Sequence, residues 1–118
     1  MRIDQLESCK ANVGHEILAK WEKEGLIKGI ITQNVDQFHQ TAGSKNVHEL
    51  HGDIRTLRCI VCEKTYPSEK YLEENGQLCG CGGFLRPNVV LFGEMLPSNA
   101  VEGAEEGIMM CDLLIVFF

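Results

Sequence analysis

The chain has 118 residues, which is the length of one ordinary domain or of part of a larger one. Hydrophobic residues make up 44% and charged residues 24%, as in an average globular domain, which excludes disorder over the whole length. Acidic residues outnumber lysines and arginines by 17 to 11, so the formal net charge is −6. Without an excess of cations the chain is poorly suited to nucleic-acid phosphates, and no nucleic-acid partner is expected.

The sequence also gives no sign of a membrane partner. No stretch reaches the about 20 apolar residues that a spanning helix needs, and no apolar segment typical of a secretory signal stands at the N-terminus. We therefore expect a reducing, cytoplasmic location. In such a compartment, the six cysteines are more often metal ligands or free thiols than disulfides.

Three elements are predicted in the first part of the chain. Apolar residues recur every four positions within 11–25, which predicts an amphipathic helix that ends at Gly25. The short β-branched run at 29–34 predicts a buried strand. A short helix is expected at 36–42, with Gly43 as its stop.

The composition changes near residue 55. From 55 to 86 the chain is polar and rich in turn residues, and it holds four of the six cysteines. Too few large apolar residues lie there to form a separate core, so a bound metal is the natural source of stability. Within this segment Ser68 is expected to cap a short helix that ends at Gly76.

The apolar pattern returns after Pro87. It predicts a strand at 88–94, a helix at 99–110 and a buried strand at 112–118. The order helix, strand, insert, strand, helix, strand predicts an α/β fold with a parallel sheet. We divide the chain accordingly into segments 1–54, 55–86 and 87–118.

The strongest chemical motif is a pair of cysteine pairs. Cys59 and Cys62 are followed, after sixteen residues, by Cys79 and Cys81. Two close pairs brought together by folding are what tetrahedral zinc with four thiolates requires. A closed set of four sulfurs leaves no open position, so the zinc would be structural. Two disulfides or free thiols are the alternative.

Two polar segments are candidates for binding a ligand. The segment Thr32–Asp36 follows the predicted strand, at the edge where an open α/β sheet binds ligands, and its amides and carboxylate suit a ribose or a carboxamide. The same residues are also ordinary turn formers. His51, which precedes Gly52, could be an exposed base or a merely structural histidine. His48 or His51 could instead replace a cysteine as a zinc ligand.

The predicted strand at 88–94 ends in Gly93 and Glu94. Its backbone edge could pair with an extended peptide. A plain core strand followed by a turn is the alternative.

In their order along the chain these motifs resemble the sirtuin family, the NAD-dependent protein lysine deacylases. The resemblance is carried by ITQNVDQFHQTAG (31–43), ELHG (49–52), the cysteine pairs and RPNVVLFGEMLP (86–97). DLLIVF (112–117) is similar to the strand that runs into a Gly-Thr-Ser loop in that family. The resemblance implies a partial Rossmann-like parallel sheet with an inserted zinc-binding module at about 55–86, in which Cys59, Cys62, Cys79 and Cys81 bind structural zinc.

The resemblance also implies a cofactor site. Gln33, Asn34 and Asp36 match the segment that lines the NAD ribose and nicotinamide pocket, and His51 also belongs to this site. Asn34 and His51 would be the catalytic residues, with His51 as general base on a ribose hydroxyl. NAD would be consumed as a co-substrate, with the acyl group transferred to ADP-ribose and nicotinamide released.

The resemblance implies a substrate site as well, in the segment 90–94. Val90 and Phe92 match residues that wall an acyl-lysine tunnel, and Gly93 and Glu94 match the edge against which a substrate peptide pairs. The expected partner is therefore an acyl-lysine protein or peptide.

The family's phosphate-binding segments, Gly-Ala-Gly-x-Ser and the Gly-Thr-Ser loop, do not occur within these 118 residues. We therefore expect the catalytic side of the cofactor site to be present and the phosphate side to be missing. An inactive sirtuin fragment that acts only as a zinc-stabilised peptide-binding module is the alternative function. A zinc-ribbon interaction module with no link to NAD is a third.

Overall fold

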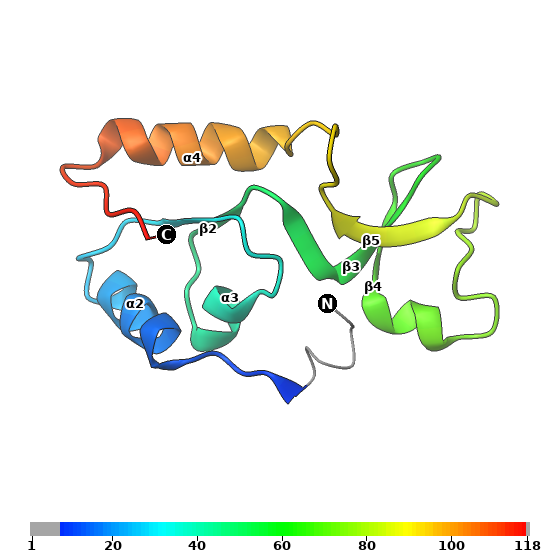
Figure 1. Ribbon diagram of the computed structural model, residues 1–118, viewed down its shortest axis with the longest axis horizontal. Coiled ribbons are helices and arrows are strands. Elements are labelled where there is room, and N and C mark those ends of the chain that lie inside the picture. Colours follow the sequence, from blue (N-terminus) through cyan, green and yellow to red (C-terminus); the bar gives the residue numbers. More distant parts are fainter. Residues whose placement is uncertain (1–7, 118) are drawn as a thin grey trace.

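A computed structural model describes residues 8–117, and Figure 1 shows how its elements are arranged. In chain order they are helix α2 (Val13–Lys23), strand β1 (Ile30–Thr32), helix α3 (Phe38–Ala42), strand β2 (Val47–Glu49), strand β3 (Gly52–Cys59), strand β4 (Thr65–Pro67), the 3₁₀ helix η1 (Ser68–Leu72), strand β5 (Leu85–Val89) and helix α4 (Ser98–Met110).

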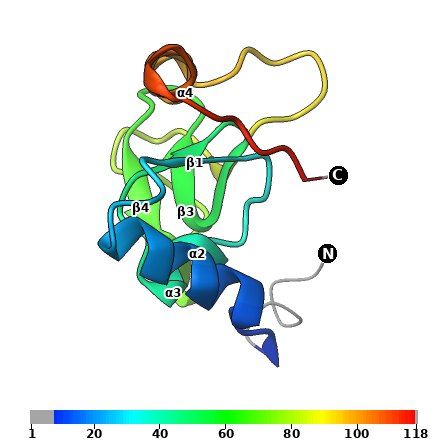
Figure 2. The same cartoon turned by 90° about the vertical axis from the view of Figure 1, so that its left-hand side faces the viewer.

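Strands β1 and β2 form a parallel pair, in which Ile30 faces Val47 and Thr32 faces Glu49. Helices α2 and α3 lie on one side of this pair and α4 lies on the other (Figures 1 and 2). The predicted α/β class with a parallel sheet is thereby confirmed. The predicted helices at 11–25, 36–42 and 99–110 and the predicted strand at 29–34 are confirmed as α2, α3, α4 and β1, each within a few residues.

Helix α2 is fixed at both ends by side chains. The side chain of Asn12 accepts from the backbone N–H of His15, and the imidazole of His15 accepts from the N–H of Asn12, which closes a reciprocal cap. Near the other end, the carboxylate of Glu22 accepts from the backbone N–H groups of Lys45 and Asn46, at 2.9 and 2.7 Å. This second contact holds the start of β2 against α2.

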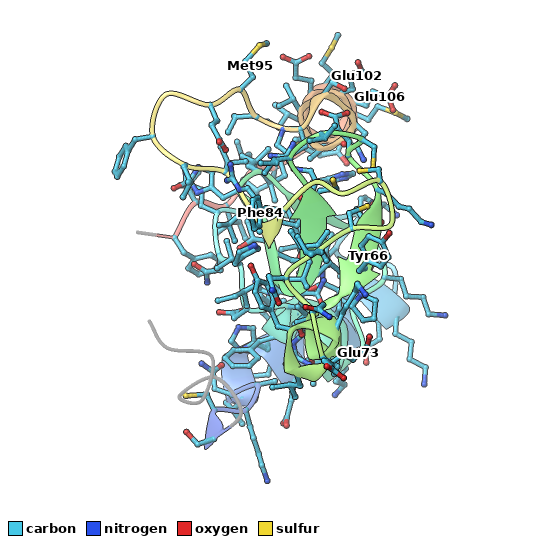
Figure 3. The ribbon with its side chains drawn as sticks, turned by 90° about the vertical axis from the view of Figure 1, so that its right-hand side faces the viewer. Tyr66, Glu73, Phe84, Met95, Glu102 and Glu106 are labelled. Carbon is cyan, nitrogen blue, oxygen red and sulfur yellow. The ribbon has the colours of Figure 1, made fainter. Side chains whose placement is uncertain are left out.

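The second sheet is antiparallel, in the order β4-β3-β5. Its small core consists of Leu57, Cys59, Cys79 and Leu85, with Tyr66 packed against them. Figure 3 views the molecule from this end, with Tyr66 on β4 and Phe84 just before β5. Because the core is small, the cysteine cluster that lies within it is well placed to add stability.

Helix α4 packs on β2 through small residues. Ala100 and Ala104 are buried, and Gly103 lies over the imidazole of His48. A Cβ atom at Gly103 would stand 2.5 Å from Cε1 of His48. The missing side chain therefore lets the helix approach the strand closely.

Two predicted strands are wrong. The strand predicted at 88–94 continues only to Val89, because the side chain of Glu94 accepts from the N–H of Leu91 and turns the chain back at that point. The apolar run at 112–118 has no strand in its described part, 112–117, where the side chains are exposed. An extended apolar segment forms a strand only when a neighbouring strand pairs with its backbone. Within residues 8–117 no strand pairs with the segment 112–117.

The prediction for residues 68–76 is also wrong in part. A short helix does form there, but it is the 3₁₀ helix η1, with Pro67 at the capping position and no side-chain cap. It ends at Leu72, and Gly76 lies in a later turn, where a Cβ atom would stand 1.9 Å from the oxygen of Lys70.

Within the described part of the chain no helix is both long and apolar enough to cross a membrane.

Candidate functional site

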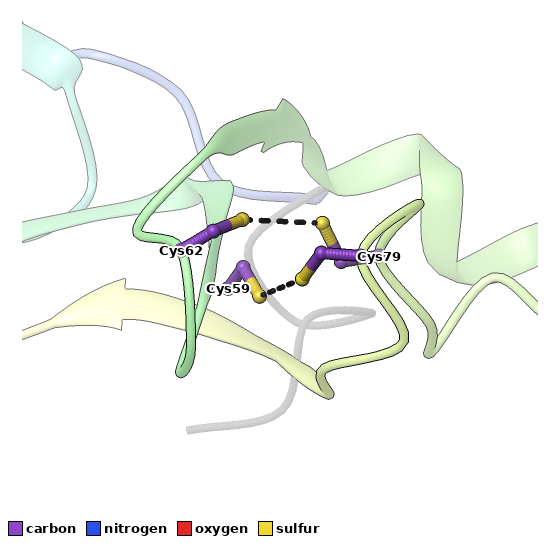
Figure 4. Close-up of side chains that lie close together, drawn as sticks. Cys59, Cys62 and Cys79 are labelled. Atoms are coloured by element: carbon purple, nitrogen blue, oxygen red, sulfur yellow. Dashed lines mark hydrogen bonds between the residues drawn. The ribbon is translucent and has the colours of Figure 1, made fainter.

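The four predicted metal ligands come together at one end of the antiparallel sheet (Figure 4). The Sγ atoms of Cys59 and Cys81 are 3.5 Å apart, those of Cys62 and Cys79 are 3.6 Å apart, and all four lie within 4.8 Å of one another. A tetrahedron with Zn–S bonds of about 2.3 Å has edges of about 3.8 Å. The donor set therefore fits zinc, whereas a disulfide would need sulfurs about 2.05 Å apart.

Two tight backbone turns present these sulfurs. In the first, the N–H of Cys59 donates to the oxygen of Lys64 at 3.0 Å. In the second, the N–H of Cys79 donates to the oxygen of Gly83 at 2.8 Å. A Cβ atom at Gly83 would stand 2.7 Å from the Sγ of Cys59, so this position requires glycine for the two turns to meet.

The surroundings of the cluster lower the pKa of Cys79 and Cys59 but raise that of Cys62. Against the opposing backbone N–H of Lys64, the sulfurs of Cys81 and Cys79 raise the pKa of Cys62 to about 12. The backbone N–H of Cys81 and the hydroxyl of Tyr66 point at the Sγ of Cys79 and lower the pKa of this thiol to about 6. The backbone N–H of Cys62, followed by that of Val61, lowers the pKa of Cys59. Thiolates are the form that binds zinc. The cluster consists of cysteines only, so His48 and His51 are not among its members.

The polar segment after β1 is held by backbone bonds to the residues that follow β2. The N–H of Leu50 donates to the oxygen of Thr32, and the N–H of Ile54 donates to the oxygen of Val35, both at 2.9 Å. Within the segment, the N–H of Asn34 donates to the hydroxyl of Thr32 at 3.0 Å. The loop is thereby fixed in place beside the start of β3.

The three predicted cofactor residues of this loop differ in exposure. The side chains of Gln33 and Asn34 are exposed, whereas Asp36 is half-buried. One carboxylate oxygen of Asp36 accepts from the N–H of Phe38 at 2.9 Å and so begins helix α3. Gln33 and Asn34 therefore present amides to solvent on a loop that its neighbours hold rigidly.

The turn that carries His51 is joined to the end of β5. The N–H of Val90 donates to the backbone oxygen of His51 at 2.9 Å, and Gly52 faces Val89 across the strands. Gly52 has φ of 73°, and a Cβ atom there would stand 2.0 Å from the oxygen of Asn88. Only glycine fits this position, so the glycine after the histidine serves the packing of β3 on β5.

The predicted substrate residues lie on the segment after β5. Val90 is half-buried and, with Glu94, lines an open hollow of about 810 Å³ that extends to the first residues of α4. Phe92 exposes its whole side chain, and Gly93 has φ of 83°. Neither of these two residues lines the hollow, and neither does His51.

Sequence reasoning missed a part-buried polar network beside the His51 turn. The carboxylate of Asp53 accepts from the N–H and the hydroxyl of Thr56, both at 2.8 Å, and Asn88 donates to that hydroxyl at 3.1 Å. This network ties β3 to β5. Asn88 stood inside the motif at 86–97, but nothing in the sequence indicated its partner 32 residues earlier.

An ion pair that closes the segment after β5 was missed as well. The guanidinium of Arg86 contacts both carboxylate oxygens of Glu94, at 2.5 and 3.1 Å, and also donates to the oxygen of Val89. These contacts, with the N–H of Leu91, lower the pKa of Glu94 to about 2. The carboxylate is therefore charged at neutral and mildly acidic pH.

Two titratable groups beneath the loop after β1 are affected by burial. Burial raises the pKa of Glu49, and burial together with the neighbouring His15, whose ring centroid is 4.7 Å away, lowers the pKa of His39. The Nδ1 atom of His39 and one oxygen of Glu49 are buried without a hydrogen-bond partner. His39 follows the polar segment that was predicted to contact a ligand, but neither residue was assigned a role of its own.

Comparison with known proteins decides the family. The model of the family described as "Sir2 family" matches residues 1–117. The chain belongs to the Sir2 family. The resemblance to sirtuins is thereby confirmed.

Curated Sir2-family relatives agree closely in sequence. The chain is 50% identical over 115 residues to an NAD-dependent protein deacetylase of Oceanobacillus iheyensis, covering 98% of this chain and 48% of the relative. It is 51% identical over 116 residues to NAD-dependent protein deacetylase 1 of Geobacillus kaustophilus, covering 98% of this chain and 47% of that protein. The chain therefore spans about half the length of the curated relatives that it matches.

Solved Sir2 structures share the fold. One, described as a complex of Sir2 with a p53 peptide and NAD⁺, is 45% identical with a TM-score of 0.77, covering 87% of this chain and 45% of that one. Another, described as Sir2 with the inhibitor EX-527, 2′-O-acetyl-ADP-ribose and a deacetylated p53 peptide, is 44% identical with a TM-score of 0.78, covering 89% and 46%. The Sir2 fold of this chain, with its parallel pair and its four-cysteine cluster, follows from these likenesses and from the geometry above.

Proposed function

We propose that this Sir2-family chain supplies the catalytic side of an NAD-dependent protein lysine deacylase, which transfers the acyl group of acyl-lysine to ADP-ribose and releases nicotinamide. One observation carries the proposal. Backbone hydrogen bonds join three segments that are distant in sequence: the loop after β1, the His51 turn and the end of β5. Residues assigned to cofactor, base and substrate therefore share one edge of the fold.

The cofactor roles go to the loop after β1 and to the His51 turn. NAD, when bound, would supply the electrophilic ribose carbon to which the acyl oxygen adds. The exposed amides of Gln33 and Asn34 fit the donors and acceptors of a ribose and a carboxamide, and Asp36 stands one step behind them. Asn34 would position the reacting groups, and His51 would take the proton from a ribose hydroxyl.

The peptide would bind at the end of β5. This strand is at the edge of its sheet, in the order β4-β3-β5, so an extended peptide can add to it. Gly93 and Glu94 would pair with the peptide backbone, and Val90 and Phe92 would wall the acyl-lysine. An apolar wall admits the neutral acyl-lysine more readily than a charged lysine.

Zinc would have a structural role, because the four thiolates leave no position open for a substrate. We propose that the module built around it comprises residues 55–86, between Rossmann-like parts at 1–54 and 87–118. Six unbridged cysteines also support a reducing, cytoplasmic location.

The test is an assay of both reaction products. Purified zinc-loaded protein would be incubated with NAD and an acetyl-lysine peptide, and mass spectrometry would measure free lysine peptide and O-acetyl-ADP-ribose. We expect both products in equal amounts once the family's phosphate-binding segments, which these 118 residues lack, are joined to the chain, and much weaker turnover without them. His51→Ala should lower turnover by at least about 100-fold, the usual contribution of a general base, while zinc content and the far-ultraviolet spectrum stay unchanged.

His15→Ala is the matched control, because His15 caps helix α2 and lies outside the proposed site. It should keep turnover within a few-fold of the parent. Peptide binding without either product by the extended chain, measured by fluorescence anisotropy with acetylated and unmodified peptides, would overturn the deacylase proposal and favour the peptide-binding module. Equal turnover by His51→Ala and the parent would overturn the role of His51.

A further inference from the structure

Tyr66 packs on the core of the antiparallel sheet, and its hydroxyl ends at the cysteine cluster. Its oxygen is 3.2 Å from the Sγ of Cys79. Tyr66 on β4 is paired with Leu57 on β3, and Leu57 is fully buried. This pairing holds the Tyr66 ring in place. Figure 3 shows Tyr66 on β4 at this end of the molecule.

The direction of this hydrogen bond follows from the chemistry of the cluster. A thiolate that binds zinc carries no proton, so it can only accept. The phenol of Tyr66 must therefore be the donor. Hydrogen bonds to a charged acceptor are stronger than those between neutral groups.

The charge around Tyr66 has the sign that such a centre needs. Four thiolates and one Zn²⁺ leave a net charge of −2. The ammonium groups of Lys64 and Lys70 lie 5.4 and 5.2 Å from the centroid of the Tyr66 ring. Two cations thus flank the ring whose hydroxyl reaches the sulfur, and one of them, Lys70, is also paired with Glu73 at 3.6 Å.

We infer that Tyr66 is a positioning residue of the zinc centre, whose hydroxyl donates to the zinc-bound thiolate of Cys79 and slows the loss of the metal. The inference depends on the four-cysteine site and not on deacylase activity. A donor to a metal-bound sulfur withdraws electron density from it and fixes its direction, as outer partners of metal ligands do in general. Removing the donor should leave the site intact but easier to open.

The chain provides a matched control. Tyr71 belongs to the same module, and its hydroxyl donates to a backbone oxygen, that of Leu85, at 2.6 Å. Tyr71→Phe therefore removes a comparable hydrogen bond that does not involve sulfur. Tyr66→Phe takes the hydroxyl donor away from a sulfur, that of Cys79, whereas Tyr71→Phe takes it away from a backbone oxygen, that of Leu85.

The experiment measures zinc transfer from the purified zinc-loaded chain to the chromophoric chelator 4-(2-pyridylazo)resorcinol. We expect both variants to bind one zinc per chain. Tyr66→Phe should release it about tenfold faster than the parent, which corresponds to one hydrogen bond to a charged group. Tyr71→Phe should stay within about twofold of the parent.

A spectroscopic readout separates an effect on sulfur from an effect on folding. In the cobalt(II)-substituted chain, Tyr66→Phe should shift the sulfur-to-cobalt charge-transfer band to longer wavelength, because the sulfur loses a donor and becomes more electron-rich. Tyr71→Phe should leave the band in place. The inference is overturned if the two variants give the same band position as the parent, or if they release zinc at equal rates.

Discussion

Gly52 and Asn88 stand so close that no other residue fits at position 52. A Cβ atom on Gly52 would lie 2.0 Å from the backbone oxygen of Asn88, and Gly52 also has φ of 73°. The contact lies between β3 and β5. His51, which precedes β3, and Val90, which follows β5, share a backbone hydrogen bond. The packing of β3 on β5 therefore decides where the proposed base stands.

Gly52→Ala should push β3 and β5 apart at this junction, the contact between Gly52 and Asn88. The cost should be about 3 kcal/mol or more, because the overlap is with backbone and cannot be relieved by a rotamer change. Gly25→Ala is the control: Gly25 also has positive φ, 78°, but nothing lies within 4 Å of its added Cβ, so only the about 1–2 kcal/mol of backbone strain applies. Urea unfolding would measure both. Equal losses in the two variants would contradict the proposed junction.

Removing the metal or one of its ligands should unfold the cysteine module. Cys59 is fully buried, and Cys59→Ala removes both a ligand and part of the small core. Zinc sites of this type contribute about 10 kcal/mol, as much as the whole stability of a typical domain. We expect the Cys59→Ala variant to lose its zinc and its cooperative melting transition. Excess chelator, which removes zinc from the parent chain, should have the same effect. Elemental analysis and thermal melting would measure both.

Cys111→Ala is the control for this prediction. Cys111 lies outside the cluster, after helix α4, where its thiol donates to the oxygen of Ile108. Its replacement should keep full zinc content and shift the melting temperature by only a few degrees. If Cys59→Ala instead kept its zinc and its stability, Cys59 would not be a ligand.

Those features that depend on neighbours in sequence were predictable. Helical periodicity located α2 and α4, and glycine at position 43 correctly marked the end of α3, where its φ is 112°. The spacing of the cysteines correctly located the metal cluster. In each case the signal and the feature lie within one short segment, or within two segments of unmistakable composition.

Features that depend on contacts across the chain were not predictable. Strand β2 has only three residues, Val47–Glu49, and is a strand because it pairs with β1 rather than because of its composition. The bond from Asn88 to Thr56 depends on how β3 and β5 align, and the pair of Arg86 with Glu94 depends on the turn that follows β5. The apolar run at 112–117 shows the reverse case, a strand-like sequence without a pairing strand among the described residues.

The ion pair between Arg86 and Glu94 predicts a dependence of stability on acid. The pKa of Glu94 is about 2 in the folded chain against an ordinary 4.5, so its contribution is fully present above about pH 4.5 and is lost as the pH falls towards 2. Glu94→Gln should therefore be less stable than the parent at pH 7, and the difference should fade by pH 2.5. Melting temperatures at several pH values would measure this.

The control for the acid effect is Glu102→Gln, which removes an exposed carboxylate of helix α4. Its melting temperature should follow that of the parent at every pH. High salt should also reduce the difference between Glu94→Gln and the parent, because the pair is partly exposed and is screened by ions. A constant difference from pH 7 to pH 2.5 would contradict the charge-based explanation.

Helix α4 offers two glycines that differ only in what lies opposite them. Nothing stands within 4 Å of a Cβ added at Gly107, so Gly107→Ala should stabilise the chain by about 0.5–1 kcal/mol through helix propensity. A Cβ at Gly103 would stand 2.5 Å from the His48 ring, so Gly103→Ala should instead destabilise it by about 1–2 kcal/mol. Thermal melting of the two variants would measure the difference.

The double variant Gly103→Ala with His48→Ala gives the decisive comparison. If the clash with the imidazole is the cause, removing the ring should restore the propensity gain, and the two changes should be coupled by about 1 kcal/mol or more. Additive effects would mean that α4 does not lie against β2 at this point. Because β2 is the partner of β1, whose end carries Gln33 and Asn34, the coupling would show that α4 lies against the strand pair that carries the proposed cofactor loop.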